Sequence, residues 1–127
     1  MEKLKLRCAD CGTALQTLRE ILQEPFSVIV RDATIQRFEY TFEAFWKCVR
    51  EYLRVEEGIE CNSPKGCFRE LFSLGSLISE EEAGTPLVMA DDRNLTSHAY
   101  KEAVAQAIFD NDNIDGYCKL MSKIYEG

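Results

Sequence analysis

The fold is decided by one long stretch, residues 30–57, which reads VRDATIQRFEYTFEAFWKCVREYLRVEE. Its apolar residues recur at intervals of three and four positions, which places them on one face of an α-helix. This seam consists of Ile35, Phe38, Phe42, Phe45, Val49 and Tyr52, with Trp46 beside it. Gly58 follows as a typical C-terminal stop. The stretch therefore predicts a long amphipathic helix whose aromatic face forms the centre of a core.

Two shorter helical stretches lie on either side of this one. The first is expected from about Glu2 to Gln23, because Pro25 cannot continue a helix. A short third helix is expected from Ser63-Pro64, with serine as the N-cap and proline in the first turn, to Gly75.

The rest of the chain predicts two more helices. Ser79 and Glu82 have the spacing of a capping box, so a fourth helix is expected to start there and to end between Leu95 and Ser97. Gly84 and Pro86 weaken its first turn and could delay its start. A fifth helix is expected from about Tyr100 to Tyr125.

No useful length of the sequence alternates with a period of two, so the predicted fold class is all-α. Three long helices and an interrupted fourth, joined by short connections, favour an antiparallel, up-and-down four-helix bundle. The Ser63–Gly75 helix is then an accessory. A length of 127 residues suits one domain, and we expect residues 1–127 to form it.

The overall charge excludes one broad class of function. A net charge of −7 argues against nucleic-acid binding that ignores sequence, because phosphates repel an acidic surface. No run of apolar residues reaches the roughly 20 needed to cross a bilayer, and no apolar signal segment follows Met1. We therefore expect a cytoplasmic protein that does not associate with membranes.

The six cysteines raise the question of a disulfide or metal framework. Cys8 and Cys11 continue the apolar seam of the first helix, and Cys118 lies on a similar seam, so these look like small core residues. Zinc bound by Cys8, Cys11, Cys61 and Cys67 is the alternative, although the second pair lacks the usual short spacing. Free, buried thiols, and no metal or cofactor, are the expectation for a reducing compartment.

The chain's only histidine lies in the polar run from Asp91 to Tyr100, DDRNLTSHAY. The Arg93 guanidinium suits a phosphate, and the His98 imidazole can exchange a proton near neutral pH. A polar helix end that only caps and hydrogen-bonds its neighbours is the alternative. Nucleotidyltransferases hold phosphates and magnesium with a Gly-Ser pair and two aspartates that follow closely on a strand. Here Asp110 and Asp112 lie far from Gly75-Ser76 and in helical sequence, so the chain is not expected to be a nucleotidyltransferase itself.

Two stretches resemble the hallmarks of one family. Residues 31–47 (RDATIQRFEYTFEAFWK) and residues 91–100 look like those of the nucleotidyltransferase substrate-binding protein family, which belongs with the helical HEPN proteins. The spacing from Arg93 to His98 to Tyr100 is similar to the signature of HEPN ribonucleases.

The resemblance implies a homodimeric bundle that associates with a separate minimal nucleotidyltransferase. It also implies a toxin-like module with metal-independent endoribonuclease activity, in which Tyr100 is the position that the transferase can adenylylate. A non-catalytic adaptor that binds nucleotide or substrate for the transferase is the alternative.

The chemistry of such cleavage defines the candidate site. It needs a base, an acid and a cation at the phosphate, so Arg93 and His98 are the candidate catalytic residues. One histidine cannot easily make both proton transfers, and a dimer would supply the second His98. Five residues along a helix leave a rotation of about 140° between Arg93 and His98, so the helix must end near Ser97 or two subunits must contribute. The remaining candidates, expected to support the cleft, are Asp92, Asn94, Gln36, Arg37 and Glu39.

Overall fold

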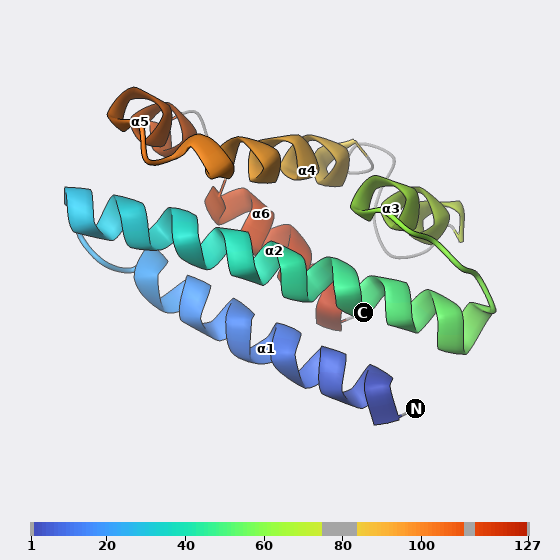
Figure 1. Ribbon diagram of the computed structural model, residues 1–127. Helices are drawn as coiled ribbons and strands as arrows, with labels where there is room; N and C mark the ends of the chain where they lie inside the picture. The colour runs from blue at the N-terminus through green and yellow to red at the C-terminus, as the bar shows by residue number, and fades with distance from the viewer. Residues whose placement is uncertain (1, 75–83, 111–113, 127) are drawn as a thin grey trace.

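The computed structural model describes residues 2–74, 84–110 and 114–126, and within them every regular element is a helix (Figure 1). The fold is an all-α helical bundle, which confirms the predicted class. In chain order its elements are α1 (Glu2–Leu22), α2 (Val28–Glu57), α3 (Pro64–Ser73), α4 (Thr85–Leu95), the 3-10 turn η1 (Thr96–His98), α5 (Glu102–Asp110) and α6 (Ile114–Glu126).

The central element is α2, which pairs with α1 as an antiparallel hairpin (Figure 1). The Ser27 hydroxyl accepts a hydrogen bond from the Val30 amide at 3.0 Å and caps the start of α2. Gly58 ends it with a φ of 67°, a left-handed conformation that glycine adopts without steric cost. Both ends of the predicted long helix therefore have a local cause.

The predicted aromatic seam of α2 forms the core. Phe38 stacks on Tyr117 of α6 with ring centroids 5.7 Å apart, and Phe42 meets the ring of Phe68 in α3 edge-on at 5.9 Å. Such pairs add to the apolar area that the rings remove from water. The core thus joins α2 to helices that are distant in the sequence.

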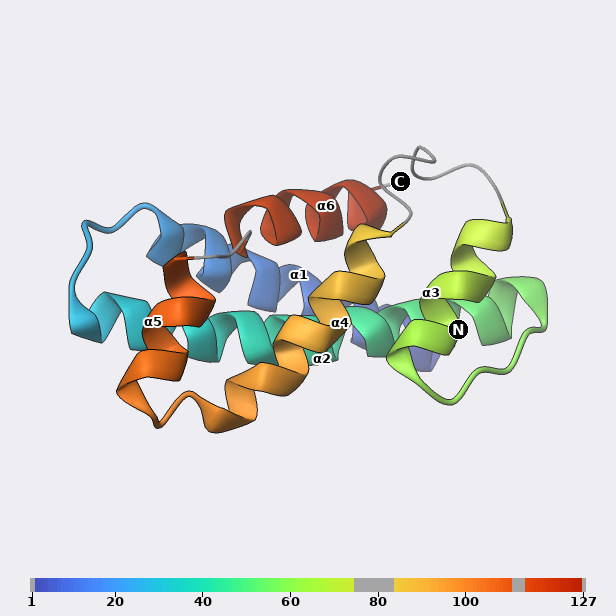
Figure 2. The same ribbon diagram turned by 90° about the horizontal axis from the view of Figure 1, so that it is seen from above.

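The other helices cover α2 on different sides. Figure 2 shows α4 crossing over α2. The chain then continues through η1 and α5 toward the N-terminal end of α2, while α3 lies near the C-terminal end of α2. Helix α6 packs against both α1 and α2. Within the described part of the chain no helix is both long and apolar enough to cross a membrane.

The predicted helix boundaries are mostly confirmed. The first three helices and the end of the fourth agree within two residues. One prediction is wrong: the single helix from Tyr100 to Tyr125 is two helices, α5 and α6. The sequence between them is Asn-Asp-Asn, and Asn and Asp are residue types with low helix propensity. The predicted capping box and the predicted stop at Gly75 lie outside the described residues.

The expectation of free thiols is wrong for one pair. Cys61 and Cys67 form a disulfide, with Cα atoms 5.3 Å apart. Cys61 precedes α3 and Cys67 lies in its first turn; the reversal of the chain at the Ser63 N-cap brings the two together. Cys11 and Cys118 are buried free thiols, as predicted for the core.

Candidate functional site

The predicted site begins where α4 ends. The α-helix stops at Leu95 and continues as a short 3-10 turn to His98. The Thr96 backbone N–H donates a hydrogen bond to the Arg93 carbonyl oxygen at the helix end, and the Thr96 hydroxyl lies 2.6 Å from the same oxygen. The prediction that the helix ends near Ser97 is confirmed.

Arg93 turns inward from α4 toward α2. Its Nε lies 3.3 Å from Oε1 of Glu43, and its side chain is only 23% exposed. Nη1 donates a hydrogen bond to the Thr96 hydroxyl at 3.3 Å. The Nε–Glu43 contact is an ion pair without hydrogen-bond geometry, which leaves this buried N–H unsatisfied. The guanidinium is therefore held in place by Glu43 and Thr96.

Glu39 completes this side of the site. Its Oε2 accepts a hydrogen bond from the Thr96 hydroxyl at 2.8 Å. Glu39 and Glu43 are one turn apart on α2, so both carboxylates face α4. Glu39 was expected to support the cleft, and its carboxylate binds Thr96, two residues before His98 in the chain.

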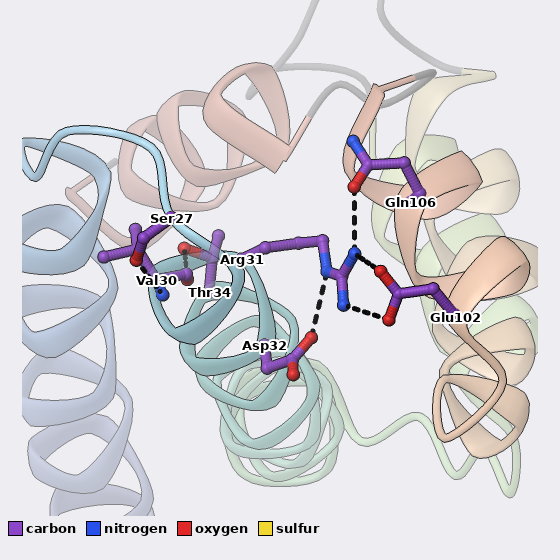
Figure 3. Close-up of polar contacts among 7 residues, drawn as sticks. All are labelled: Ser27, Val30, Arg31, Asp32, Thr34, Glu102 and Gln106. Atoms are coloured by element: carbon purple, nitrogen blue, oxygen red, sulfur yellow. Dashed lines mark hydrogen bonds and ion pairs between the residues drawn. The ribbon is translucent and has the colours of Figure 1, made fainter.

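A second polar contact lies where α2 begins. Arg31 is buried, with 2% of its side chain exposed, and its guanidinium makes a two-pronged ion pair with Glu102 at 2.8 and 2.9 Å (Figure 3). Its remaining donors bind Gln106 at 2.9 Å and Asp32 at 3.0 Å. The hydrogen bonds between Arg31 and Glu102 raise the pKa of Arg31 and lower the pKa of Glu102.

These two contacts hold both ends of the segment that carries the histidine. We call them the polar clamp: Thr96 with Glu39 at one end, and Glu102 with Arg31 at the other. Eight residues separate Arg31 from Glu39, which is about 12 Å along a helix. One rigid helix therefore fixes the start and the end of residues 96–102.

The residues between the two ends of the polar clamp face the solvent. His98 is exposed, and within the described residues nothing hydrogen-bonds to its imidazole. Tyr100 is 80% exposed, and its only described contact is with the Lys101 ammonium, 5.8 Å from the ring centroid. The arrangement thus presents an imidazole and a phenol on a backbone that is held at both ends.

The other predicted residues fall into two groups. Asp92 accepts a hydrogen bond from the Tyr117 hydroxyl at 2.5 Å, which ties α4 to α6, whereas Asn94 and Gln36 have exposed side chains. Arg37 donates to the Thr17 carbonyl of α1 at 2.8 Å. Two residues along a helix correspond to about 200°, so Arg37 faces away from Glu39 in this chain, and its role in a cleft stays a prediction.

Three contributors to this site were not predicted from the sequence: Thr96, Glu102 and the burial of Arg31. Arg31 lies four residues before Ile35 and seven before Phe38, so it shares the face of the helix that points into the core. An arginine on such a face is a signal of a buried ion pair. The partner, 71 residues away, carries no local signal.

Within the described ranges, no group of three or more His, Cys, Asp or Glu side chains is placed to hold a metal ion.

The fold and the site define a class: all-α bundles that display an Arg…His…Tyr segment on a buried polar support. The chain matches the family described as "Nucleotidyltransferase substrate binding protein like" over residues 6–127. It therefore belongs to this family, as its two hallmark stretches led us to expect.

A solved structure with the same fold comes from Thermus thermophilus. That crystal structure is 49% identical in sequence, with a TM-score of 0.80, and the match covers 90% of this chain and 94% of that one. A search of curated proteins finds no relative of this chain.

Proposed function

We propose that this protein is the helical partner of a separate minimal nucleotidyltransferase, of HEPN type, and that it cleaves RNA without a metal. The observation that carries the proposal is the polar clamp, which fixes both ends of the exposed segment that carries His98 and Tyr100, with Arg93 shortly before it in the chain. A capping role alone would not require two distant residues of α2 to fix this segment at both ends.

The proposed reaction uses general acid–base chemistry. A neutral His98 takes the proton of a ribose 2′-hydroxyl, whose oxygen attacks the adjacent phosphorus. A protonated His98 gives its proton to the departing 5′-oxygen, leaving a 2′,3′-cyclic phosphate. The Arg93 guanidinium, whose side chain is 23% exposed, stabilises the negative charge that gathers on the phosphate oxygens.

Two proton transfers require two imidazoles, and the chain has one histidine. We therefore propose a homodimer in which each subunit contributes its His98 to one cleft. RNA is plentiful in the cytoplasm, which is where we expect the protein to act.

Tyr100 is the proposed regulatory position. Its exposed phenol can be reached by a partner enzyme, and adenylylation would add a bulky anion two residues from His98. That anion would compete with RNA for Arg93 and block the cleft, which gives the transferase a way to silence the nuclease.

The central test is RNA cleavage by the purified protein in EDTA, with His98→Ala as the variant. We expect cyclic-phosphate products from the wild type and a loss of at least about 100-fold in rate for the variant, the scale of general acid–base catalysis. Glu70→Ala, an exposed change on α3, is the matched control. Full activity in His98→Ala, or activity restored only by metal, overturns the proposal.

The dimer has its own test. When wild-type chains are mixed and re-equilibrated with an excess of His98→Ala chains, activity should fall with the square of the wild-type fraction. A linear fall would show that one His98 suffices.

A non-catalytic adaptor is the second candidate, favoured by two observations. Glu43 already neutralises Arg93, and the net charge of −7 opposes RNA binding. Co-purification with the adjacent transferase, no RNA cleavage, and unchanged assembly of His98→Ala would support this function instead.

A further inference from the structure

A second chemically distinctive place lies away from the polar clamp. The thiols of Cys8 in α1 and Cys48 in α2 approach each other, with 3.2 Å between the two Sγ atoms. They border a cavity of about 490 Å³ whose lining includes Tyr52, Leu71 and Tyr125. The cavity is bounded by α1, α2, α3 and α6, whereas the polar clamp joins α2 to η1 and α5.

The geometry favours a bond between these sulfurs. A disulfide has its sulfurs about 2.05 Å apart, so the gap to close is about 1.2 Å. Both residues already face each other across an antiparallel helix pair. Rotations about the Cα–Cβ bonds can therefore supply much of the approach without separating α1 from α2.

The two thiols differ in access. Both thiols border the cavity, but Cys8 is only half-buried, whereas Cys48 is buried with 9% exposed. Burial raises the pKa of Cys48, and its hydrogen bond with Cys8 raises it further. Cys8 is thus the thiol that a reagent in the cavity meets, and Cys48 is a protonated thiol held beside it.

We propose that Cys8 and Cys48 form a redox-active dithiol site whose oxidant is a low-molecular-weight disulfide, such as oxidised glutathione. The Cys8 thiol loses its proton to the solvent, and the resulting thiolate attacks one sulfur of the reagent, forms a mixed disulfide and releases one thiolate, which takes up a proton. The Cys48 sulfur then attacks Cys8, and its proton goes to the second departing thiolate. The two protein thiols lose two electrons and the reagent gains them, giving two free thiols and a Cys8–Cys48 disulfide.

The product links α1 to α2 across a separation of 40 residues. A cross-link of that span restricts the unfolded chain and stabilises the hairpin. This inference is independent of the proposed RNA cleavage, because none of its residues belongs to the polar clamp or to the Arg93–His98 segment.

The test uses the full-length protein equilibrated with oxidised glutathione, quenched in acid, alkylated and digested with trypsin. Cleavage after Arg7, Arg19, Lys47 and Arg50 releases peptides 8–19 and 48–50. We expect these two peptides to be joined in the wild type. Because peptide 8–19 also contains Cys11, the assignment needs Cys8→Ser, which should lose the link, and Cys11→Ser, which should keep it.

The sharpest variant is Cys48→Ser, which removes the resolving thiol. It should accumulate one glutathione per chain on Cys8, whereas the wild type should pass through that adduct to the cross-link. Cys118→Ser, at a buried thiol of α6, is the matched control and should behave as wild type.

Three results overturn the proposal: complete alkylation of Cys8 and Cys48 after oxidation, a stable adduct on Cys8 in the wild type, or no adduct in Cys48→Ser. If a serine variant misfolds by circular dichroism, the alanine variant replaces it. The link between Cys61 and Cys67 should be present throughout and serves as the internal standard.

Discussion

The α1–α2 hairpin and the segment of residues 96–102 are held in different ways. The hairpin is held by apolar seams, with Leu15, Leu18 and Phe38 fully buried. Helices α4 and α5 also bury apolar side chains, but the segment between them is fixed to α2 by polar contacts of single side chains, and His98 and Tyr100 are exposed. Burial of apolar side chains supplies most of the folding free energy and depends little on their exact orientation, whereas polar pairs fix the positions of the groups that they join. We infer that stability resides in the hairpin and function in the segment.

The largest effect should come from breaking the hairpin. Phe38→Ala removes a fully buried ring that stacks on Tyr117, and we expect a loss of about 3–5 kcal/mol in the free energy of unfolding. Urea denaturation measures it. Ile29→Ala, at a side chain 82% exposed, is the control and should change stability by less than about 0.5 kcal/mol.

The same variant also sharpens the functional side of the comparison. RNA cleavage per folded molecule should be unchanged in Phe38→Ala under conditions where it stays folded. A large loss of activity in the folded fraction would show that the two regions are not separable.

The next effect is a pH dependence that belongs to the polar clamp. Arg31 lowers the pKa of Glu102 in the folded chain, so this pair contributes stability above the unfolded-state value of about 4.5 and loses it as pH falls through the folded value. We expect the free energy of unfolding to fall as the pH is lowered. Near pH 4 its slope against pH should correspond to the uptake of up to about one proton on unfolding.

Glu102→Gln tests this assignment. Its stability should be lower than that of the wild type at pH 7, and the difference should shrink as pH falls toward 3. Glu70→Gln, an exposed glutamate on α3, is the control with an unchanged pH profile. A constant difference between Glu102→Gln and wild type from pH 7 to 3 would refute the role of this ion pair.

These regions also differ in how far the sequence predicts them. The apolar periodicity of α1 and α2, the Ser63 cap and the Gly58 stop are local signals, and the fold class followed from them. The end of α4 near Ser97 was predicted from the geometry that catalysis requires. The partners of Arg31 and Thr96 could not be predicted, because they are 71 and 57 residues away and depend on tertiary packing. The Cys61–Cys67 disulfide was not predicted, because free thiols were expected from a reducing compartment. The turn of the chain that brings these two residues together was not considered.

A smaller effect should follow when the other end of the polar clamp is broken. Thr96→Val keeps the shape but removes a hydroxyl that binds Glu39 and Arg93. We expect a loss of about 1–2 kcal/mol in the free energy of unfolding, because a hydrogen bond to a charged group is lost.

RNA cleavage should fall about tenfold in Thr96→Val, since roughly 1.4 kcal/mol of lost positioning corresponds to that factor. Thr13→Val, at an exposed position of α1, is the matched control for both measurements. Loss of stability with full activity would show that the polar clamp supports the fold and not the site.

The smallest effect concerns α3, which belongs to neither region. The Ser63 hydroxyl accepts a hydrogen bond from the Gly66 amide at 3.0 Å, and Ser63→Ala should cost about 1 kcal/mol in thermal or urea unfolding. Ser63→Asp should restore it, because a carboxylate also caps and is favoured at a helix N-terminus. Neither change should alter RNA cleavage, since α3 contributes no residue to the polar clamp. If Ser63→Ala lowered cleavage at unchanged stability, the functional region would extend along α4 to the helix that packs against it, and the division between hairpin and segment would have to be redrawn.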